Sequence, residues 1–256
     1  MITSSQNPKI KLARALLGRP KERLEAGAFV MDGVRLVEEA VISNWGFVFV
    51  LYDDSLSERG MVLVESLKSR GIEVEMISSS LMTSLSGTET PQGILAVLEL
   101  AQLPIPNLPN FLLILDQIRD PGNLGTLLRT ADAAGAQAVL LPPETTDAFA
   151  PKVVRAGMGA HFRLPIHSMT WEEIEQISKS ANLQVFLADM GGLSCWETDL
   201  RQPLALVIGG EAQGASQPAR KLANKQISIP MEGGAESLNA AVAGSILMFE
   251  IVRQRK

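Results

Sequence analysis

Five polar side chains that could carry chemistry lie in three glycine-rich segments of the C-terminal part of the chain, after residue 110. They are Asn123, Arg129, Glu211, Ser237 and Asn239. Glycines permit close backbone approach by a ligand. A guanidinium stays protonated in proteins, so an arginine in such a set suits a phosphate or a developing alkoxide better than a role as base. The residue types therefore indicate a site for an anionic or hydroxyl-bearing substrate.

The first segment, DPGNLGTLLRTADAAGA (residues 120–136), is predicted to run from a polar loop into a helix. Asp120 suits an N-cap, and Pro121 suits the first helical position. An apolar stripe at helical spacing would face the core, and it consists of Leu124, Leu127, Leu128 and Ala131. Arg129 is not part of this stripe and is expected near the N-terminal end of the helix. The positive helix terminus disfavours a cation there unless an anion lies nearby. A salt bridge to Asp132 or Asp120 is the alternative.

The second and third segments also follow predicted strands. Glu211 comes directly after the pair Gly209 and Gly210 and is the candidate partner of Arg129, although an ordinary turn with a solvated Glu is the alternative. In the third segment Ser237 would cap the last helix, which leaves Asn239 without a structural reason. Small residues on that helix would allow a close-packed neighbour such as a second chain, and they are Ala240, Ala241, Ala243 and Gly244.

The elements that must position these residues predict an α/β protein in two parts. The segment AQLPIPNLPN, residues 101–110, has three prolines and no charge, so we expect an extended linker. Residues 1–100 alternate helices and strands and predict a small α/β domain. Residues 111–256 hold apolar strands without polar alternation, which predict a mostly parallel sheet covered on both faces. The strands are expected at 111–115, 138–142, 184–189, 204–210 and 226–231. Ligands collect at the carboxyl ends of such strands.

Composition limits the class of protein. The single cysteine excludes an internal disulfide, and the two histidines lack the partners of a zinc site, so we expect no metal. No apolar run approaches the ~18 residues of a membrane span, and the N-terminal residues lack the apolar stretch of a secretory signal. We therefore expect a cytoplasmic protein that does not enter a membrane.

Charge is distributed unevenly along the chain. The net charge of −5 argues against a protein that coats itself with nucleic acid. Residues 1–25 nevertheless hold six Lys or Arg against two Glu, a local balance of +4. This basic segment is a candidate RNA contact, and a solvated helix face is the alternative. The candidate RNA-binding residues are Lys9, Lys11, Arg14, Arg19 and Arg129.

The three segments together resemble the three motifs of the SpoU (TrmH-like) family of RNA ribose 2′-O-methyltransferases, within the SPOUT superfamily. The matching stretches are DPGNLGTLLRTADAAGA, LALVIGGEAQGAS and ISIPMEGGAESLNAAVAGSILMFE, and their order and intervals also match. VVRAGMGAHFRLP is similar to the segment between the first two motifs. SSQNPKIK and TETPQGILAV resemble the family's substrate-binding domain, so the resemblance covers nearly the whole chain.

The resemblance implies methylation of RNA ribose with S-adenosylmethionine (S-adenosyl-L-methionine) as methyl donor, with large-subunit ribosomal RNA as the favoured substrate. It also implies a homodimer joined through the C-terminal domain, an active site near the subunit boundary, and a trefoil knot that holds the donor largely through backbone groups. The five polar residues named at the outset match the family's functional positions. The donor-binding positions implied are Leu187, Ala188, Asp189, Met190, Ile208, Gly209, Gly210, Ile229, Pro230, Met231 and Leu238.

Other functions remain open from the sequence. A tRNA ribose methyltransferase and a non-catalytic RNA-binding protein that has kept the fold are both compatible with the motifs. A dehydrogenase is disfavoured because the glycine pattern is not G-x-G-x-x-G.

Overall fold

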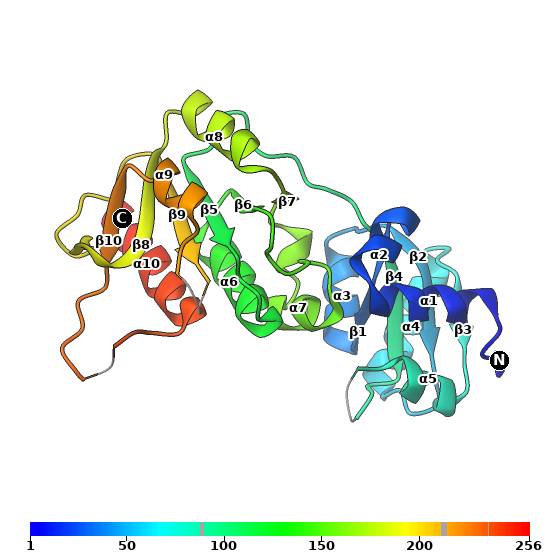
Figure 1. Ribbon diagram of the computed structural model, residues 1–256. Helices are drawn as coiled ribbons and strands as arrows, with labels where there is room; N and C mark the ends of the chain where they lie inside the picture. The colour runs from blue at the N-terminus through cyan, green and yellow to red at the C-terminus, as the bar shows by residue number, and fades with distance from the viewer. Residues whose placement is uncertain (88–89, 211–213, 235) are drawn as a thin grey trace. The chain divides into compact units, whose positions relative to one another are not determined.

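The computed structural model describes residues 1–87, 90–210, 214–234 and 236–256 and divides into two compact units (Figure 1). The first unit comprises residues 1–101 and 149–162, and the second comprises 102–148 and 163–256. The polypeptide therefore passes from one unit to the other at residues 101–102, 148–149 and 162–163. The predicted division into 1–100, 101–110 and 111–256 stays a prediction, and it did not include residues 149–162 in the first unit.

The first unit is built on a four-stranded sheet. The strands lie in the order β1-β4-β2-β3, with β4 antiparallel to both β1 and β2, and β3 parallel to β2. Its elements are α1 (Pro8–Gly18), α2 (Pro20–Ala26), β1 (Ala28–Asp32), α3 (Val34–Ile42), β2 (Phe47–Tyr52), α4 (Glu58–Ser69), β3 (Val74–Met76), α5 (Ser79–Leu85), β4 (Ile94–Glu99), α7 (Pro151–Gly157) and a 3₁₀ turn at Ala160–Phe162.

Alternating side chains give this sheet two apolar faces. On β1, Phe29 and Met31 belong to one cluster, whereas Ala28 and Val30 belong to the other, as the two-residue period of a strand requires. The first cluster is closed by α3, α4 and the segment 149–162, and the second by α1 and α5. The segment 149–162 is therefore part of the core of the first unit.

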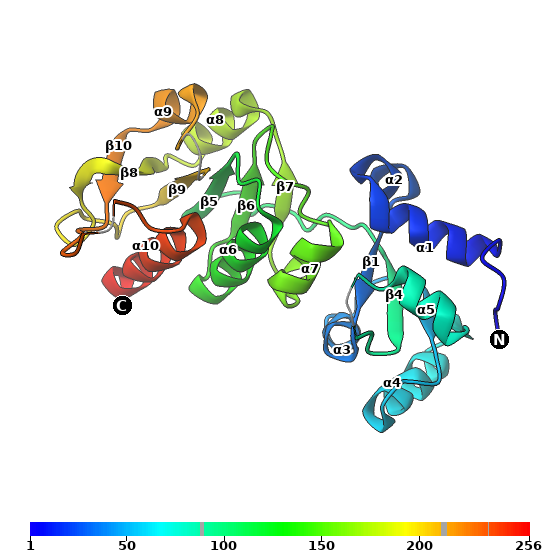
Figure 2. The same ribbon diagram turned by 60° about the horizontal axis from the view of Figure 1, so that its bottom comes forward.

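The second unit holds a six-stranded, wholly parallel sheet in the order β10-β8-β9-β5-β6-β7. Helices α6 and α10 lie on one face, and α8 and α9 lie on the other (Figure 2). Its elements are β5 (Phe111–Asp116), α6 (Pro121–Ala134), β6 (Ala138–Leu141), β7 (Ile166–Ser168), α8 (Trp171–Ser180), β8 (Gln184–Ser194), β9 (Leu204–Gly209), α9 (Gln217–Leu222), β10 (Lys225–Ser228) and α10 (Ala240–Arg255).

The observed sheet confirms the predicted fold class. All five predicted apolar strands of this unit are present, and both faces of the sheet are covered. The predicted knot stays a prediction, because strand order alone does not establish how the chain is threaded. Among the described residues, every helix is too short or too polar to cross a bilayer.

Candidate active site

The order of the strands in the sheet changes direction at β5, and the candidate site lies at this point. After β5, the next two strands, β6 and β7, are added on one side, whereas β9 lies on the other side. Asp116 at the end of β5 is in register with Gly209 at the end of β9. In parallel α/β sheets, ligands bind outside the carboxyl ends of the strands at such a reversal. The glycine-rich segments predicted from the sequence begin at this edge.

The start of α6 follows the sequence prediction. Asp120 is the N-cap and accepts a hydrogen bond from the backbone N–H of Asn123 over 2.8 Å, with Pro121 at the first helical position. The four residues of the predicted apolar stripe are fully buried. The cap and the buried stripe together leave Asn123 half-buried on the first turn, beside the sheet edge.

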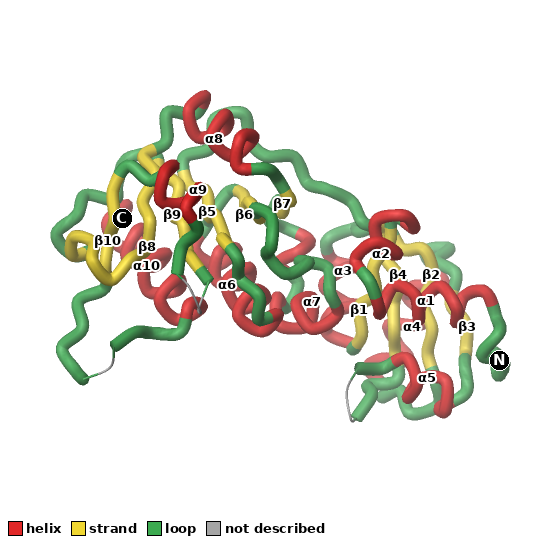
Figure 3. Tube along the Cα trace, in the orientation of Figure 1, coloured by secondary structure: helices red, strands yellow, loops and turns green. Residues whose placement is uncertain are grey.

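The start of α10 differs from the prediction. The N-cap is Asn239, whose Oδ1 accepts hydrogen bonds from the backbone N–H groups of Ala241 (2.9 Å) and Val242 (3.2 Å). The predicted capping role of Ser237 is therefore wrong. Ser237 is exposed in the segment between β10 and α10, which is drawn as loop in Figure 3. Capping α10 is the structural role of Asn239 that was not recognised in the sequence.

The first and third segments meet at these two helix starts. Asn239 Nδ2 donates a hydrogen bond to Asn123 Oδ1 over 3.1 Å. Farther along the two helices, the hydroxyls of Thr130 and Ser245 lie 3.1 Å apart. The α6–α10 contact therefore fixes one catalytic candidate against another.

Close packing of α6 on α10 explains a glycine that we had linked to a second chain. A Cβ on Gly244 would lie 2.5 Å from Leu127 Cδ2, so a larger residue there would require the Leu127 side chain to move. Ala240 and Ala241 are buried within their own chain as well. For these three residues, the neighbour that small side chains permit lies in the same chain.

Arg129 lies apart from Asn123 on α6. It is the ninth residue of α6, in the middle of the helix rather than near its start, and its side chain is exposed. At roughly 100° per residue, Arg129 is turned about 120° around the helix from Asn123. The alternative salt bridges are not formed, since Asp132 accepts from Arg163 Nε over 3.0 Å and Asp120 caps the helix. Within the described residues Arg129 has no ion-pair or hydrogen-bond partner, and its predicted partner Glu211 lies outside them.

The glycine pair at the end of β9 is packed tightly against neighbouring backbone. A Cβ on Gly209 would lie 2.6 Å from the backbone nitrogen of Ala215, and a Cβ on Gly210 would lie 2.5 Å from the carbonyl oxygen of Gln117. A side chain at Gly210 would push the second segment away from the end of β5, and one at Gly209 would push residues 214–215 away from the end of β9. Glycine here thus keeps the two loops together.

The predicted donor-binding positions 187–190 lie in the middle of β8, and those after β9 and β10 lie at or just beyond the carboxyl ends of these strands. Between Gln226 and Ile227 of β10, the paired residue on β8 changes from Leu187 to Leu193. The residues between these two, 188–192, thus lie outside the β8–β10 register, which is the kind of irregularity found beside active sites. Leu187 and Ile208 are buried in the core, so they offer a ligand backbone groups only. Three other predicted donor-binding residues are exposed, namely Met190, Pro230 and Met231.

Asp189 is already engaged by a neighbouring helix. Its Oδ2 lies 2.8 Å from Arg220 Nη1 of α9, and its Oδ1 accepts from the backbone N–H of Gly191 over 3.0 Å. This ion pair ties the irregular part of β8 to the helix that follows the second segment. Ala188 on β8 and Ile229 after β10 are half-buried. Leu238, which directly precedes the N-cap of α10, is half-buried as well.

The basic candidates of the first unit separate into two groups. Lys9 Nζ lies 2.6 Å from Glu73 Oε1 and 3.1 Å from Glu75 Oε1, so it already forms ion pairs with two carboxylates. These carboxylates raise the pKa of Lys9, although burial opposes the rise. Exposed side chains without an ion pair to another described residue are Lys11, Arg14 and Arg19. Arg23, in the same basic segment, is buried and donates to the carbonyl oxygens of Leu16 and Gly18.

Comparison with known proteins decides the family. Residues 110–249, more than half of the chain, match the model of the SpoU rRNA Methylase family. This chain belongs to the SpoU rRNA methylase family. Residues 7–96 match the MRM3-like substrate binding domain. The family recognised in the sequence is thereby confirmed.

Relatives of this SpoU chain match it along nearly its whole length. The 23S rRNA (guanosine(2553)-2′-O)-methyltransferase RlmP of Bacillus subtilis (strain 168) is 34% identical, with 98% of each chain covered. The crystal structure of the SpoU methyltransferase AviRb from Streptomyces viridochromogenes, in complex with the cofactor AdoMet, is 31% identical with a TM-score of 0.85, covering 97% of this chain and 99% of its own. The AdoMet-bound rRNA methyltransferase from Sinorhizobium meliloti is 32% identical with a TM-score of 0.86, covering 98% and 97%.

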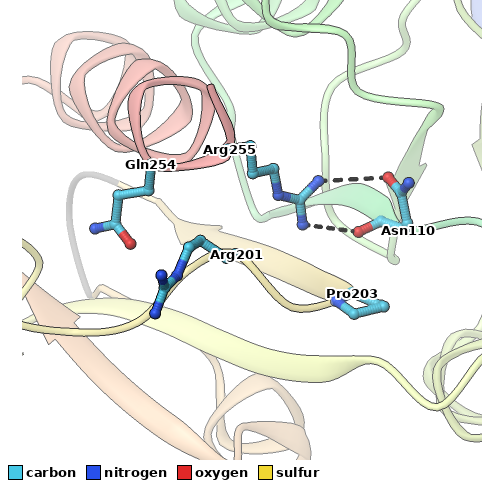
Figure 4. Close-up of a pocket in the computed structure, with 5 residues that line it drawn as sticks. All are labelled: Asn110, Arg201, Pro203, Gln254 and Arg255. Carbon is cyan, nitrogen blue, oxygen red and sulfur yellow. Dashed lines mark hydrogen bonds between the residues drawn. The ribbon is translucent and has the colours of Figure 1, made fainter.

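A cavity elsewhere in the SpoU unit does not belong to this site. It has a volume of about 320 Å³ and is lined by Asn110, Arg201, Pro203, Gln254 and Arg255 (Figure 4). Asn110 precedes β5 and Pro203 precedes β9, so the cavity lies at the amino ends of these strands. Arg255 Nη2 donates to the carbonyl oxygens of Asn110 and Gln202, which anchors the end of α10 there. This arrangement indicates a structural role.

One residue of the SpoU site was missed in the sequence. Asp116 is fully buried, and its Oδ2 accepts a hydrogen bond from the backbone N–H of Ser216 over 2.6 Å. Burial raises the pKa of this carboxyl, and the bonds to Ser216 oppose the shift. A carboxylate that ends an otherwise apolar strand was the available signal. Within the described residues, no group of three His, Cys, Asp or Glu is arranged to hold a metal ion.

Proposed function

We propose that this chain transfers a methyl group from S-adenosylmethionine to the 2′-hydroxyl of a ribose in large-subunit ribosomal RNA. Membership of the SpoU family and relatives named as 23S rRNA methyltransferases support the substrate. The AdoMet-bound structures of relatives support the donor. The observation that carries the proposal for this chain is the Asn123–Asn239 hydrogen bond, which joins the first and third segments at the strand reversal.

The strand ends of this chain fit the proposed donor. The glycine pair 209–210 leaves no room for side chains, and residues 188–192 lie outside the β8–β10 register, so backbone groups are brought to one edge. These groups and the residues 229–231 would hold S-adenosylmethionine. When bound, it supplies a methyl group on a positively charged sulfur, open to in-line attack by a ribose oxygen. Aligning the two reactants supplies ~7–11 kcal/mol of the barrier in favourable cases.

Arg129 would act on the RNA rather than as a base. Its guanidinium stays protonated, so it suits a backbone phosphate or the oxygen that becomes negative as the hydroxyl loses its proton. Its exposure and its lack of a partner among the described residues leave its donors available. Asn123, fixed by Asn239, would orient the ribose. Ser237 and Glu211 stay proposed members of the site, with Glu211 as the group that fixes the rotamer of Arg129.

The first unit would supply further RNA contacts. It matches the MRM3-like substrate binding domain, and Lys11, Arg14 and Arg19 form its exposed basic segment. Such contacts to phosphate position RNA without reading its sequence. Lys9 stays a candidate, although its two ion pairs reduce what it can contribute. The predicted cytoplasmic location belongs to the same proposal, since the proposed substrate is ribosomal RNA.

A second copy of the chain would complete the assembly. Helix α10 exposes Val242 (47%) and Phe249 (50%) at helical spacing, and Phe249 lines an open apolar hollow with Trp196 and Ile246. We assign this face to a homodimer contact through the second unit. Because Arg129 is turned away from Asn123, a nearby second subunit would bring further groups to the RNA.

A methyl-transfer assay tests the proposal directly. The protein is incubated with S-adenosylmethionine labelled in the methyl group and with separated ribosomal RNA, transfer RNA and assembled large subunits. Label in ribose of large-subunit RNA is expected. Label in transfer RNA alone would favour the tRNA alternative, and donor binding without transfer to any RNA would favour a non-catalytic RNA-binding protein.

A further inference from the structure

The buried carboxylate of Asp116 joins three parts of the candidate site. The residue ends β5, pairs in register with Gly209 of β9, and accepts the Ser216 backbone N–H over 2.6 Å. Ser216 is the N-cap of α9 and closes the loop that begins at Gly210. One side chain thus binds the far end of the second segment, while its own strand contacts the near end.

Contacts between described residues link Ser216 to the glycine pair. Gly209 is packed against the backbone of Ala215, and Gly210 against the backbone of Gln117, the residue after Asp116. Gly210 and Gly214 also form a bridge across the loop. Loss of the carboxylate would release the Ser216 end, and the glycine backbone at the other end would follow.

The chemistry of the carboxylate makes this bond strong. Asp116 is fully buried, and its Oδ1 has no hydrogen-bond partner among the described residues. A buried polar group with half of its capacity unused is costly, so it is retained where it serves a purpose other than stability. A bond from a backbone N–H to a carboxylate is stronger than one to a neutral oxygen.

We propose that Asp116 is a positioning residue that, through Ser216 and Ala215, holds the backbone of Gly209 and Gly210 in place to bind S-adenosylmethionine. The inference rests on the proposed placement of the donor at Gly209 and Gly210. Asp116 itself touches neither reactant, because it is fully buried. Its effect is on the affinity for the donor, and the affinity for RNA is set elsewhere.

The first unit provides a matched control. Asp53 is also buried and follows directly on a strand, β2, and its Oδ1 accepts from the backbone N–H (3.1 Å) and the hydroxyl (2.6 Å) of Ser55. Asp53→Ala therefore removes the same kind of bond from a buried carboxylate, in a unit without the donor loops. Any loss of donor binding caused only by lower stability would be shared by both variants.

The experiment measures binding of S-adenosylmethionine by calorimetry and the KM for donor and for RNA, in the full chain. Asp116→Ala is expected to weaken donor binding and raise the donor KM about tenfold, with the RNA KM unchanged. Asp116→Asn keeps an oxygen for the Ser216 N–H, so it is expected to recover part of the loss, and it serves if the alanine variant fails to fold. Asp53→Ala is expected to leave both constants unchanged.

Two results separate the failure of this inference from failure of the proposed function. If the unaltered chain binds the donor and both Asp116 variants bind it within twofold of that value, Asp116 has no positioning role. If the unaltered chain itself binds no donor, the proposed function fails with it. A parallel loss of donor binding in Asp53→Ala would also overturn the inference, because a general loss of stability would then explain the result.

Discussion

Asn239 donates a hydrogen bond to Asn123 over 3.1 Å while its own oxygen caps α10. A single amide therefore performs two tasks: its oxygen begins a helix, and its nitrogen fixes a residue of another helix. The two asparagines belong to the first and third sequence segments, which only the fold brings together. The two tasks can be separated by substitution.

Replacing Asn239 by Asp is expected to reduce methyl transfer with little effect on stability. A carboxylate still accepts the two N–H groups and is favoured at a helix start, but it cannot donate to Asn123. Asn239→Ala should also lower the free energy of unfolding by about 0.5–2 kcal/mol. Ser57 caps α4 in the first unit, away from the proposed RNA-binding segment, so Ser57→Ala is the control with a similar loss of stability and unaltered transfer. Thermal unfolding and transfer rates are compared, and full activity in Asn239→Asp would contradict the role given to this bond.

Arg129→Ala is expected to lower kcat/KM for RNA about a hundredfold without altering thermal unfolding. The side chain is exposed and unpaired among the described residues, so its loss should not disturb the fold. Arg129→Lys should recover only part of the activity because an ammonium lacks the two-pronged geometry of a guanidinium. Arg119, exposed and paired with Glu144 at 2.7 Å, provides the control Arg119→Lys. Full turnover and unchanged RNA affinity in Arg129→Lys would rule out a role for the two-pronged guanidinium.

Phe249→Glu is expected to convert a homodimer into a monomer, because a carboxylate on the apolar face of α10 would be buried without a partner in the contact. Light scattering after size-exclusion chromatography gives the mass directly. Leu108 is also exposed in the second unit but lies in the proline-rich linker, so Leu108→Glu should leave the mass unchanged. A monomeric unaltered chain would remove the basis of this prediction.

Replacing Lys11 and Arg14 together by Glu is expected to weaken RNA binding and make it less dependent on salt. Each lost phosphate contact lowers the slope of log affinity against log salt by about one. The matched control is Lys21→Glu, which alters a basic residue of the same unit that is already paired with Glu25. Titrations at several salt concentrations measure the slope, and an unaltered slope would place the RNA elsewhere.

Cys195 is expected to resist thiol reagents at pH 8 until the chain is unfolded. Burial, followed by the nearby charge of Glu250, raises the pKa of this thiol to about 11 from the usual 9.0. The folded protein keeps the proton that the unfolded chain releases above pH 9.0, so the thiol lowers stability as pH rises from about 9 to 11. Cys195→Ala should make the free energy of unfolding less dependent on pH in that window. Rapid labelling of the folded protein would contradict this placement.

Periodicity and local chemistry were sufficient to predict much of the second unit. Five continuous apolar runs gave the strands, and the leucine stripe together with Asp120 and Pro121 gave the start of α6. Neither β1 nor β7 was predicted, and the residues of β7, Ile166–Ser168, do not form an apolar run. The sequence prediction assigned the cap of α10 to Ser237 and did not consider Asn239, although both side chains can cap a helix. The selection of Asn239 as the cap becomes clear only in the folded structure, where Asn123 lies beside it.

Asp116 shows a different limit. In sequence it is the last residue of an apolar strand, and its partner Ser216 lies 100 positions away. Nothing local indicates that its oxygen would be used to close a distant loop. Likewise, the apolar side chains of Val154 and Phe162 indicate that residues 149–162 pack in a hydrophobic core. They do not indicate that this core belongs to the first unit.

The assignment of residues 149–162 to the first unit has a consequence for biosynthesis. As the chain leaves the ribosome from its amino end, residues 1–101 emerge with one apolar face incompletely covered, and the covering helix follows only after β5, α6 and β6 have been made. The first unit therefore cannot complete its core independently of the second. For the same reason, a protease cut in the linker would leave two fragments that stay associated, since one of them carries a helix embedded in the other.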